Sequence, residues 1–213
     1  AAVSRGISRT FLLADMPFGS CGDKAMAVAN ARRLLAAGAH AVKIEGEKAN
    51  AELIGAVVKS GIAVCGHIGY TPQTRGPKAS IQGKSIDRAR ELIAAASALE
   101  AAGVFMIVLE LIPEELCREI TRMVSIPTIG IGAGRFCDGQ VQVVHDLLGL
   151  SSRVYRHARA YCQAREEFSR AMRAYASDVR VGRFPEEKNA VSIPQEVVRA
   201  AVGIDSRVPG VSP

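Results

Sequence analysis

One unit of sequence occurs twice in this chain: a helix-like segment that ends in glycine, followed by an apolar segment that ends in glutamate. The first copy passes through Gly38 to Glu45, and the second passes through Gly103 to Glu110. Glycine after a helical pattern is typical of a left-handed C-terminal cap, and a largely apolar segment is typical of a buried strand. The repetition predicts alternating helices and strands, with acidic side chains gathered at the carboxyl ends of the strands.

The same pattern of helix and strand continues along most of the chain. We predict helices over residues 25–37, 49–60 and 87–102, another beginning at Pro113, and strands over residues 10–14, 39–45, 62–65, 104–109, 126–131 and 140–144. We expect residues 66–73 to be a loop and residues 74–84 to be a surface loop. Six strands are two fewer than a (β/α)8 barrel needs. The chain is therefore either an open α/β sheet or a barrel whose first two units are absent. Residues 1–185 would form the barrel domain, and 186–213 would form a C-terminal tail.

Composition excludes several classes of function. The 213 residues carry a net charge of +6, but the arginines alternate with glutamates on predicted helices, and no aromatic residues interleave with them. This pattern favours solvated helix surfaces over a nucleic-acid site. No apolar run approaches the roughly 20 residues that span a membrane. The five cysteines form no C-x-x-C pair, which indicates thiols in a reducing compartment and predicts a cytoplasmic protein.

The predicted strand ends carry a set of residues suited to acid–base and metal chemistry. Asp15, Lys43, Glu45, His67 and Glu110 come from four different strand ends, and ligands of parallel sheets bind at that end. Lys43 and Glu45 would share one face of their strand because side chains alternate. Carboxylates suit Mg²⁺, lysine suits an anionic substrate group, and a remaining carboxylate could remove a proton beside a carbonyl.

Each of these residues also has a structural explanation. Lys43 and Glu45 could belong to an ion pair covering a sheet edge, and Asp15, which precedes Met16 and Pro17, could be a turn residue. Glu110 could favour the start of the following helix through the helix dipole. His67 has no second histidine at metal-ligand spacing, so a hydrogen-bonded structural role is the stronger hypothesis for it.

Seven blocks of the chain, in order, resemble the ketopantoate hydroxymethyltransferase family, whose members are Mg²⁺-dependent (β/α)8 enzymes of the phosphoenolpyruvate/pyruvate superfamily. The resemblance extends over about residues 1–185. The blocks lie at residues 13–18, 42–46, 64–69 with 71–73, 108–110, 126–134, 138–140 with 145–146, and 182–185. It implies transfer of a hydroxymethyl group from methylene-tetrahydrofolate to α-ketoisovalerate, which gives ketopantoate for pantothenate and coenzyme A.

The resemblance also implies roles for individual residues. Asp15 would bind the metal and lie beside the keto acid, and Glu45 would complete the metal site, largely through water. Lys43 would hold the substrate, with His67 placed among the substrate-binding residues, and Glu110 would accept the proton. The partners would be the keto acid, the folate and further copies of the chain in a homo-oligomer, in the cytoplasm or, in a eukaryote, the mitochondrion.

The chain departs from the family's pattern at several positions. In the family, two earlier strands supply another metal-binding aspartate and a serine that contacts the keto acid; neither is present here. The segment 75–83 differs where substrate and folate contacts would lie, and Glu47 replaces a glycine. Two alternatives follow: an inactive or truncated relative that keeps only the scaffold and assembly surface, or a superfamily lyase that uses Cys65 as its acid or base.

Overall fold

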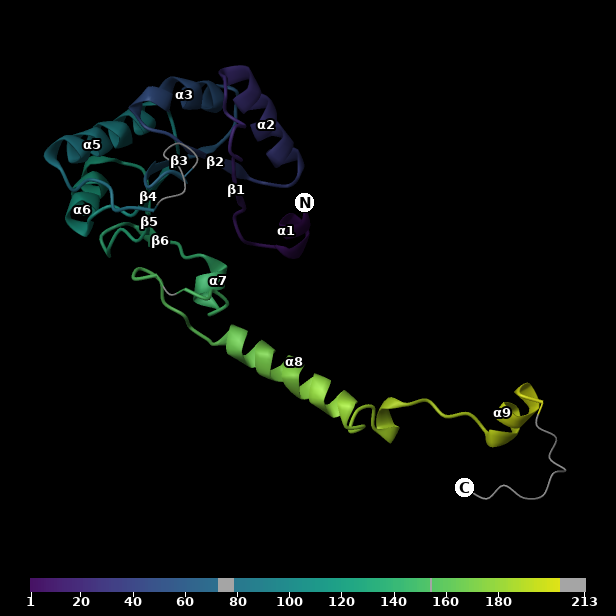
Figure 1. Cartoon of the computed structure of the whole chain (residues 1–213). Helices are drawn as coiled ribbons and strands as arrows, with labels where there is room; N and C mark the ends of the chain where they lie inside the picture. The colour runs from purple at the N-terminus through teal and green to yellow at the C-terminus, as the bar shows by residue number, and fades with distance from the viewer. Residues whose placement is uncertain (73–78, 154, 204–213) are drawn as a thin grey trace.

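Six parallel strands form a single curved sheet, and their order in space is their order in sequence. The computed structural model describes residues 1–72, 79–153 and 155–203 (Figure 1). The strands are β1 (Leu13–Asp15), β2 (Ala41–Glu45), β3 (Val64–Gly69), β4 (Met106–Glu110), β5 (Thr128–Ile131) and β6 (Gly139–Gln140). Sequential order without reversal is the arrangement of a barrel wall, whereas doubly wound sheets reverse direction at a switch point. The predicted α/β class, with six strands of a barrel-like wall, is confirmed.

The helices that follow the strands cover the outer face of the sheet. They are α2 (Lys24–Ala36), α3 (Ala51–Lys59), α5 (Ile86–Ala101) and α6 (Glu114–Met123), with the short turn η1 (Lys48–Asn50) before α3. Figure 1 shows these four helices on the same convex side. A right-handed crossover between adjacent strands taken in order places each helix on the same face, which curls the sheet around its other face.

Alternation along β2 divides its side chains between the two faces, as predicted. Val42 and Ile44 are fully or almost fully buried in the core cluster, which they share with Ile54 of α3. Lys43 and Glu45 point to the inner, concave face, where Lys43 is in register with Asp15 and Glu45 with His67. The hydrophobic layer between sheet and helices therefore fixes which β2 side chains reach the concave face.

Glycines end the helices that precede β2 and β4. Gly38 has φ of +100° and Gly103 has φ of +90°, the left-handed region that a residue with a side chain adopts only with strain. Their amides bond to Leu35 and Glu100 oxygens at 2.8 and 2.9 Å, which closes each helix. The predicted repeat of helix, glycine, strand and terminal glutamate is confirmed.

Two strand predictions were wrong. β3 continues through Gly66 and Gly69, which we had assigned to a loop. Gly66 lies in the strand, where it pairs with Ile44 of β2 and Ile107 of β4. A β-carbon there would stand 2.8 Å from Leu99 Cδ1 of α5, so the glycine reflects close packing and not a turn. The last strand was placed at residues 140–144, but β6 ends at Gln140, and Val144 begins the helix α7 (Val144–Leu147). Val144 is 56% exposed, so this apolar segment does not pack against the core as a buried strand would.

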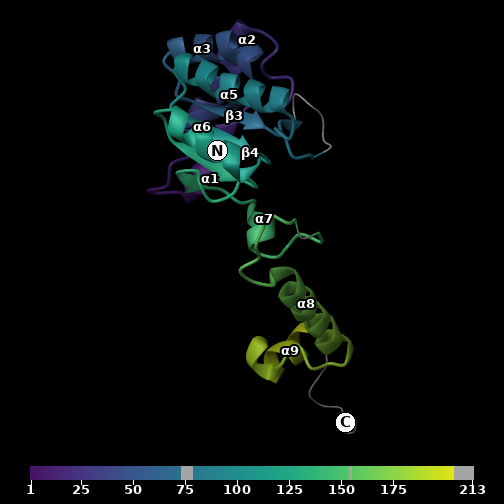
Figure 2. The same ribbon diagram turned by 90° about the vertical axis from the view of Figure 1, so that its left-hand side faces the viewer.

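The remaining elements lie outside the sheet and its helices. They are α1 (Ala2–Gly6), α8 (Ala164–Arg180), the turn η2 (Glu187–Asn189) and α9 (Gln195–Ala201). Figure 2 shows α7, α8 and α9 extending away from the sheet and its helices. Among the described helices, none has the length and hydropathy to cross a membrane. The boundary at residue 185 between the barrel domain and the C-terminal tail stays a prediction. Of the loop expected at residues 74–84, residues 74–78 lie outside the described residues.

Candidate active site

The predicted site residues gather at the carboxyl ends of β1 to β4, an edge called the rim below. Lys43 Nζ lies 3.0 Å from Asp15 Oδ2, so β1 and β2 are joined by an ion pair. The Lys43 side chain is 18% exposed, whereas that of Asp15 is 60% exposed. An ammonium group has three N–H donors. One carboxylate therefore leaves Lys43 with donors for a second anionic group at the rim.

His67 lies between the two glutamates of the repeated unit. Its Nε2 is 3.0 Å from Glu110 Oε2, and its Nδ1 is 3.8 Å from Glu45 Oε1. Among the described residues, neither ring nitrogen has a partner with good hydrogen-bond angles, although the ring is 1% exposed. Buried polar atoms normally have such partners. A structural histidine would have hydrogen-bond partners for its ring nitrogens, so these contacts do not support the structural role favoured for His67. Its substrate-binding role stays a prediction.

Glu110 occupies a position where a carboxylate can reach both solvent and His67. Its side chain is 21% exposed, and it ends β4 beside Gly69 of β3. Its backbone oxygen accepts a hydrogen bond from Tyr70 N at 2.8 Å. The strand pairing and this bond fix the backbone from which the Glu110 carboxylate extends, as a proton-accepting group requires.

Tyr70 is a rim residue that the sequence did not single out. Burial raises the pKa of the Tyr70 hydroxyl, and nearby Glu110, Glu45 and Tyr155 raise it further. The phenol therefore remains protonated and can donate a hydrogen bond at neutral pH. Its position directly after β3 could have pointed to it, but we had placed the end of β3 four residues too early.

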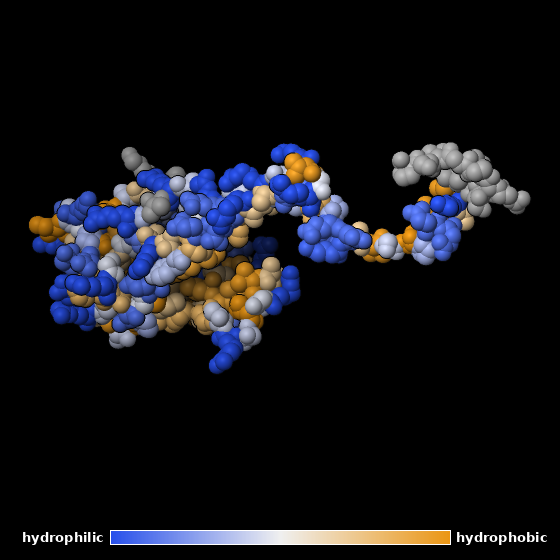
Figure 3. Space-filling view, turned by 90° about the horizontal axis from the view of Figure 1, so that it is seen from below, coloured by the Kyte–Doolittle hydropathy of each residue, from blue (hydrophilic) through white to orange (hydrophobic). Residues whose placement is uncertain are grey.

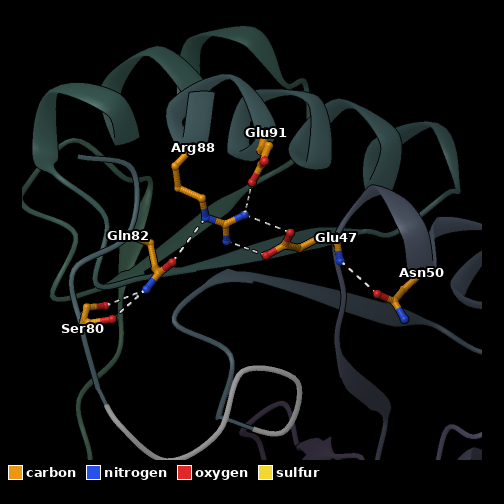
Figure 4. A network of polar contacts seen from close by, with 6 residues as sticks. All are labelled: Glu47, Asn50, Ser80, Gln82, Arg88 and Glu91. Carbon is orange, nitrogen blue, oxygen red and sulfur yellow. Dashed lines mark hydrogen bonds and ion pairs between the residues drawn. The ribbon is translucent and has the colours of Figure 1, made fainter. Parts of the chain in front are cut away.

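A polar network holds the segment that follows Glu45 (Figure 4). The Arg88 guanidinium of α5 contacts both carboxylate oxygens of Glu47, with Nη1 3.0 Å from Oε2, and Nη1 also lies 2.8 Å from Glu91 Oε2. Arg88 Nε donates to Gln82 Oε1 at 3.3 Å, which adds the segment before α5. A two-pronged arginine–carboxylate contact is strong and directional. Glu47, one of the departures from the family's pattern, is thus the residue that ties this loop to α5.

Cys65 does not fit the lyase alternative. It is fully buried in β3, and burial raises the pKa of its thiol to about 12, against a smaller opposing effect of Lys43. A thiol that is inaccessible and protonated at neutral pH is a poor acid or base for a bound substrate.

The rim offers carboxylate oxygens for a magnesium ion but no closed cage. Within the described ranges, no three His, Cys, Asp or Glu side chains lie together as a potential metal site. Asp15 and Glu45 end neighbouring strands, and most of the Asp15 side chain is accessible to solvent. Mg²⁺ is commonly bound through one or two carboxylates while it keeps several waters. The donor chemistry therefore fits a hydrated Mg²⁺ and not an ion held by protein alone.

Comparison with known proteins extends the evidence to nearly the whole chain. A family model described as ketopantoate hydroxymethyltransferase matches residues 1–187. The chain is 47% identical over 194 residues to 3-methyl-2-oxobutanoate hydroxymethyltransferase of Thermotoga sp. (strain RQ2), covering 89% of this chain and 72% of that protein. It is 44% identical over 206 residues to the enzyme of the same name from Roseiflexus sp. (strain RS-1), covering 95% and 74%.

Solved structures show weaker likeness. Dihydrodipicolinate synthase of Agrobacterium tumefaciens str. C58 is 16% identical, with a TM-score of 0.42 over 62% of this chain and 48% of that one. A likeness at this level supports no statement about activity. The family match and the sequence identities confirm the predicted relationship: this chain belongs to the ketopantoate hydroxymethyltransferase family.

Proposed function

We propose that this chain transfers a hydroxymethyl group from methylene-tetrahydrofolate to 3-methyl-2-oxobutanoate, the keto acid also called α-ketoisovalerate. Relatives that are 43%, 47% and 48% identical to this chain bear the name of this activity. The observation that carries the proposal is the rim itself: an accessible carboxylate, Glu110, stands beside His67 on the face that also holds the Asp15–Lys43 ion pair. A proton acceptor next to an anion-binding lysine suits a keto acid that must lose a proton beside its carbonyl.

Each residue has a defined task in this proposal. Lys43 binds the substrate carboxylate with the N–H donors that Asp15 leaves available. Glu110 accepts the proton from the carbon beside the carbonyl, and the electron pair of that C–H bond moves toward the carbonyl oxygen. The resulting carbon nucleophile forms a C–C bond with the methylene carbon of the folate. The two C–N bonds of that carbon break with their electron pairs left on the folate nitrogens, and a water molecule supplies the hydroxyl group. The nitrogens take up the proton from the keto acid and one from the water, and tetrahydrofolate leaves. His67 lies beside the Glu110 carboxylate, and the Tyr70 backbone N–H donates to the Glu110 backbone oxygen, so both residues help to hold Glu110 in place.

Asp15 and Glu45 would hold a magnesium ion. Their carboxylates lie at the ends of adjacent strands, and the lysine on the same face leaves room for a further ligand on Asp15, whose side chain is 60% exposed. The ion would supply positive charge that stabilises an oxygen gaining negative charge during proton removal.

Hydrogen exchange in the keto acid tests the proton-removal step without folate. We expect the chain to exchange the proton beside the carbonyl of α-ketoisovalerate into deuterated water, and removal of Mg²⁺ by a chelator to slow this exchange at least tenfold, because the ion stabilises the developing charge. Proton NMR follows the loss of signal. Titration with Mg²⁺ and with the keto acid should each raise the melting temperature of the chain, because a ligand that binds only the native state stabilises that state.

The inactive-relative alternative makes the opposite prediction. If neither the ion nor the keto acid shifts the melting temperature and no exchange occurs, the chain retains the scaffold without the chemistry. Thermal shift without exchange would instead place the defect in proton transfer, and would contradict the role proposed for Glu110.

We also propose that the chain forms a homo-oligomer. Four apolar side chains lie on one face of α8, and all are substantially exposed: Phe168, Met172, Tyr175 and Val179. Figure 3 shows further hydrophobic surface in a hollow of the sheet-bearing part of the molecule. Exposed apolar surface of this kind is commonly buried between subunits. Multi-angle light scattering should therefore report a mass above 22.6 kDa, and a monodisperse monomer would contradict the proposal.

A further inference from the structure

Two cysteines from different elements meet on the helix-covered side of the sheet. Cys117 is buried in α6, and Cys137 lies in the segment between β5 and β6, half-buried and packed against the core that contains Cys117. Cys137 also lies against β5, because its Sγ is 3.0 Å from the point where a side chain on Gly130 would begin. The glycine thus makes room for the Cys137 sulfur.

The surroundings of the two sulfurs shift the pKa values of their thiols in opposite directions. The neighbouring Cys117 thiol is the largest cause that lowers the pKa of Cys137, and the hydroxyls of Thr128 and Thr121 lower this pKa further, against the effect of burial. The Cys137 neighbour is in turn the largest cause that raises the pKa of Cys117, and burial raises it further. Cys137 is therefore the sulfur that favours the thiolate, and the thiolate is the form that reacts with electrophiles.

Only one of these sulfurs faces open space. Cys137 lines an open depression of the surface, together with Arg135 and Gln140, whereas Cys117 is fully buried behind it. The Cys137 thiol thus lies in front and the Cys117 thiol behind it. Thr121, one turn after Cys117 on α6, has its Oγ1 2.9 Å from Thr128 Oγ1 of β5, and Asp138, next to Cys137, accepts a hydrogen bond from Thr128 N at 2.8 Å. These bonds hold α6, β5 and the segment of Cys137 against one another. Neither cysteine belongs to the rim, so the pair is independent of the function proposed above.

We propose that Cys137 and Cys117 form a redox-sensitive thiol pair that a hydroperoxide converts to a disulfide. The Cys137 thiolate attacks one peroxide oxygen, the O–O bond breaks, and the departing oxygen takes a proton to leave as water or an alcohol. Cys137 is then a sulfenic acid. The Cys117 sulfur loses its proton and attacks the Cys137 sulfur, and hydroxide departs and is protonated to water. The two thiols lose two electrons, which reduce the peroxide.

The disulfide would connect α6 to the segment between β5 and β6. That segment carries Gly134, whose backbone passes so close to Glu114 of α6 that a side chain would begin 2.1 Å from Glu114 Cβ. The two elements are therefore already in close contact, and a covalent bond between the sulfurs requires them to approach to about 2.05 Å.

Peptide mapping of the oxidised protein tests the proposal. After treatment with one equivalent of hydrogen peroxide, tryptic digestion without reductant should give one cross-linked species that joins the peptides containing Cys117 and Cys137, and dithiothreitol should remove it. C117S should stop at a sulfenic acid on Cys137 that dimedone traps, and C137S should leave Cys117 reduced. C162S is the matched control, since Cys162 is the exposed cysteine outside the pair, and it should leave the cross-link unchanged.

Alkylation of the wild-type chain gives a second measurement that does not depend on folding of the variants. Iodoacetamide at neutral pH should label Cys137 at least tenfold faster than Cys117 and Cys65. The proposal is overturned if Cys137 and Cys117 both stay reduced while Cys162 oxidises, if the cross-link joins another pair, or if Cys137 reacts no faster than Cys65.

Discussion

Glu110→Gln should slow exchange of the α-ketoisovalerate proton by about 100- to 10,000-fold, the range that a positioned general base contributes. Glutamine keeps the size of the side chain and can still lie beside His67, but it cannot accept the proton. Proton NMR in deuterated water measures the rate, with Mg²⁺ and the keto acid both saturating. The melting temperature should change little, because the Glu110 side chain is partly exposed.

Two further variants decide whether the effect belongs to Glu110. Glu119→Gln is the matched control: Glu119 lies on α6, in an exposed ion pair with Arg122, and its loss should leave exchange unchanged. Glu45→Gln addresses the alternative that the residues alone left open. If Glu45→Gln removes exchange while Glu110→Gln retains it at constant Mg²⁺ occupancy, the two glutamates have the reverse roles.

Gly69→Ala should lower the free energy of unfolding by about 2–5 kcal/mol, combining a left-handed backbone with an overpacked contact. Gly69 has φ of +100°, and a β-carbon there would stand 2.1 Å from the backbone oxygen of Glu110 and 2.8 Å from Ile112 Cγ1. The strand pairing between β3 and β4 must shift to admit it. Urea denaturation measures the loss.

Gly61→Ala separates the two causes of that loss. Gly61 also has a left-handed backbone, with φ of +84°, but nothing lies within 4 Å of the position of its β-carbon. Its replacement should cost only the backbone term, about 1–2 kcal/mol. If both variants lost the same free energy of unfolding, the contact with the Glu110 oxygen would not contribute to the cost of Gly69→Ala. Gly69→Ala should in addition slow proton exchange, because it displaces the backbone that carries the Glu110 side chain.

The architecture could be predicted from the sequence where short-range pattern and burial agree. Alternation placed Lys43 and Glu45 on one face, and the spacing from Gly38 and Gly103 located the ends of β2 and β4. Prediction failed where a residue's local preference opposed its packing. Gly66 indicates a loop by composition, yet it pairs with strands on both sides inside β3, and its lack of a side chain lets Leu99 of α5 pack close to it.

The sequence was enough to predict which acidic and basic residues lie at the rim, but not which residues they contact there. Strand ends indicated that Asp15, Lys43 and Glu110 lie on one edge. Their partners depend on register between strands far apart in sequence, and nothing local encodes that Lys43 meets Asp15 or that His67 lies between two glutamates. The approach of Cys117 to Cys137 depends in the same way on how α6 packs against β5.

The glycine-closed turns before β2 and β4 have a practical consequence for engineering this chain. Gly38 and Gly103 lie before the amino ends of the strands, seven residues ahead of the rim glutamates, and each strand that ends in such a glutamate is five residues and roughly 16 Å long. We expect substitutions around these turns to change mainly the free energy of unfolding, whereas substitution of Glu45 or Glu110 themselves should change mainly the chemistry of the rim. Stability and catalytic activity could thus be varied in two separate libraries of variants, one with substitutions at the amino ends of these strands and one with substitutions at their carboxyl ends.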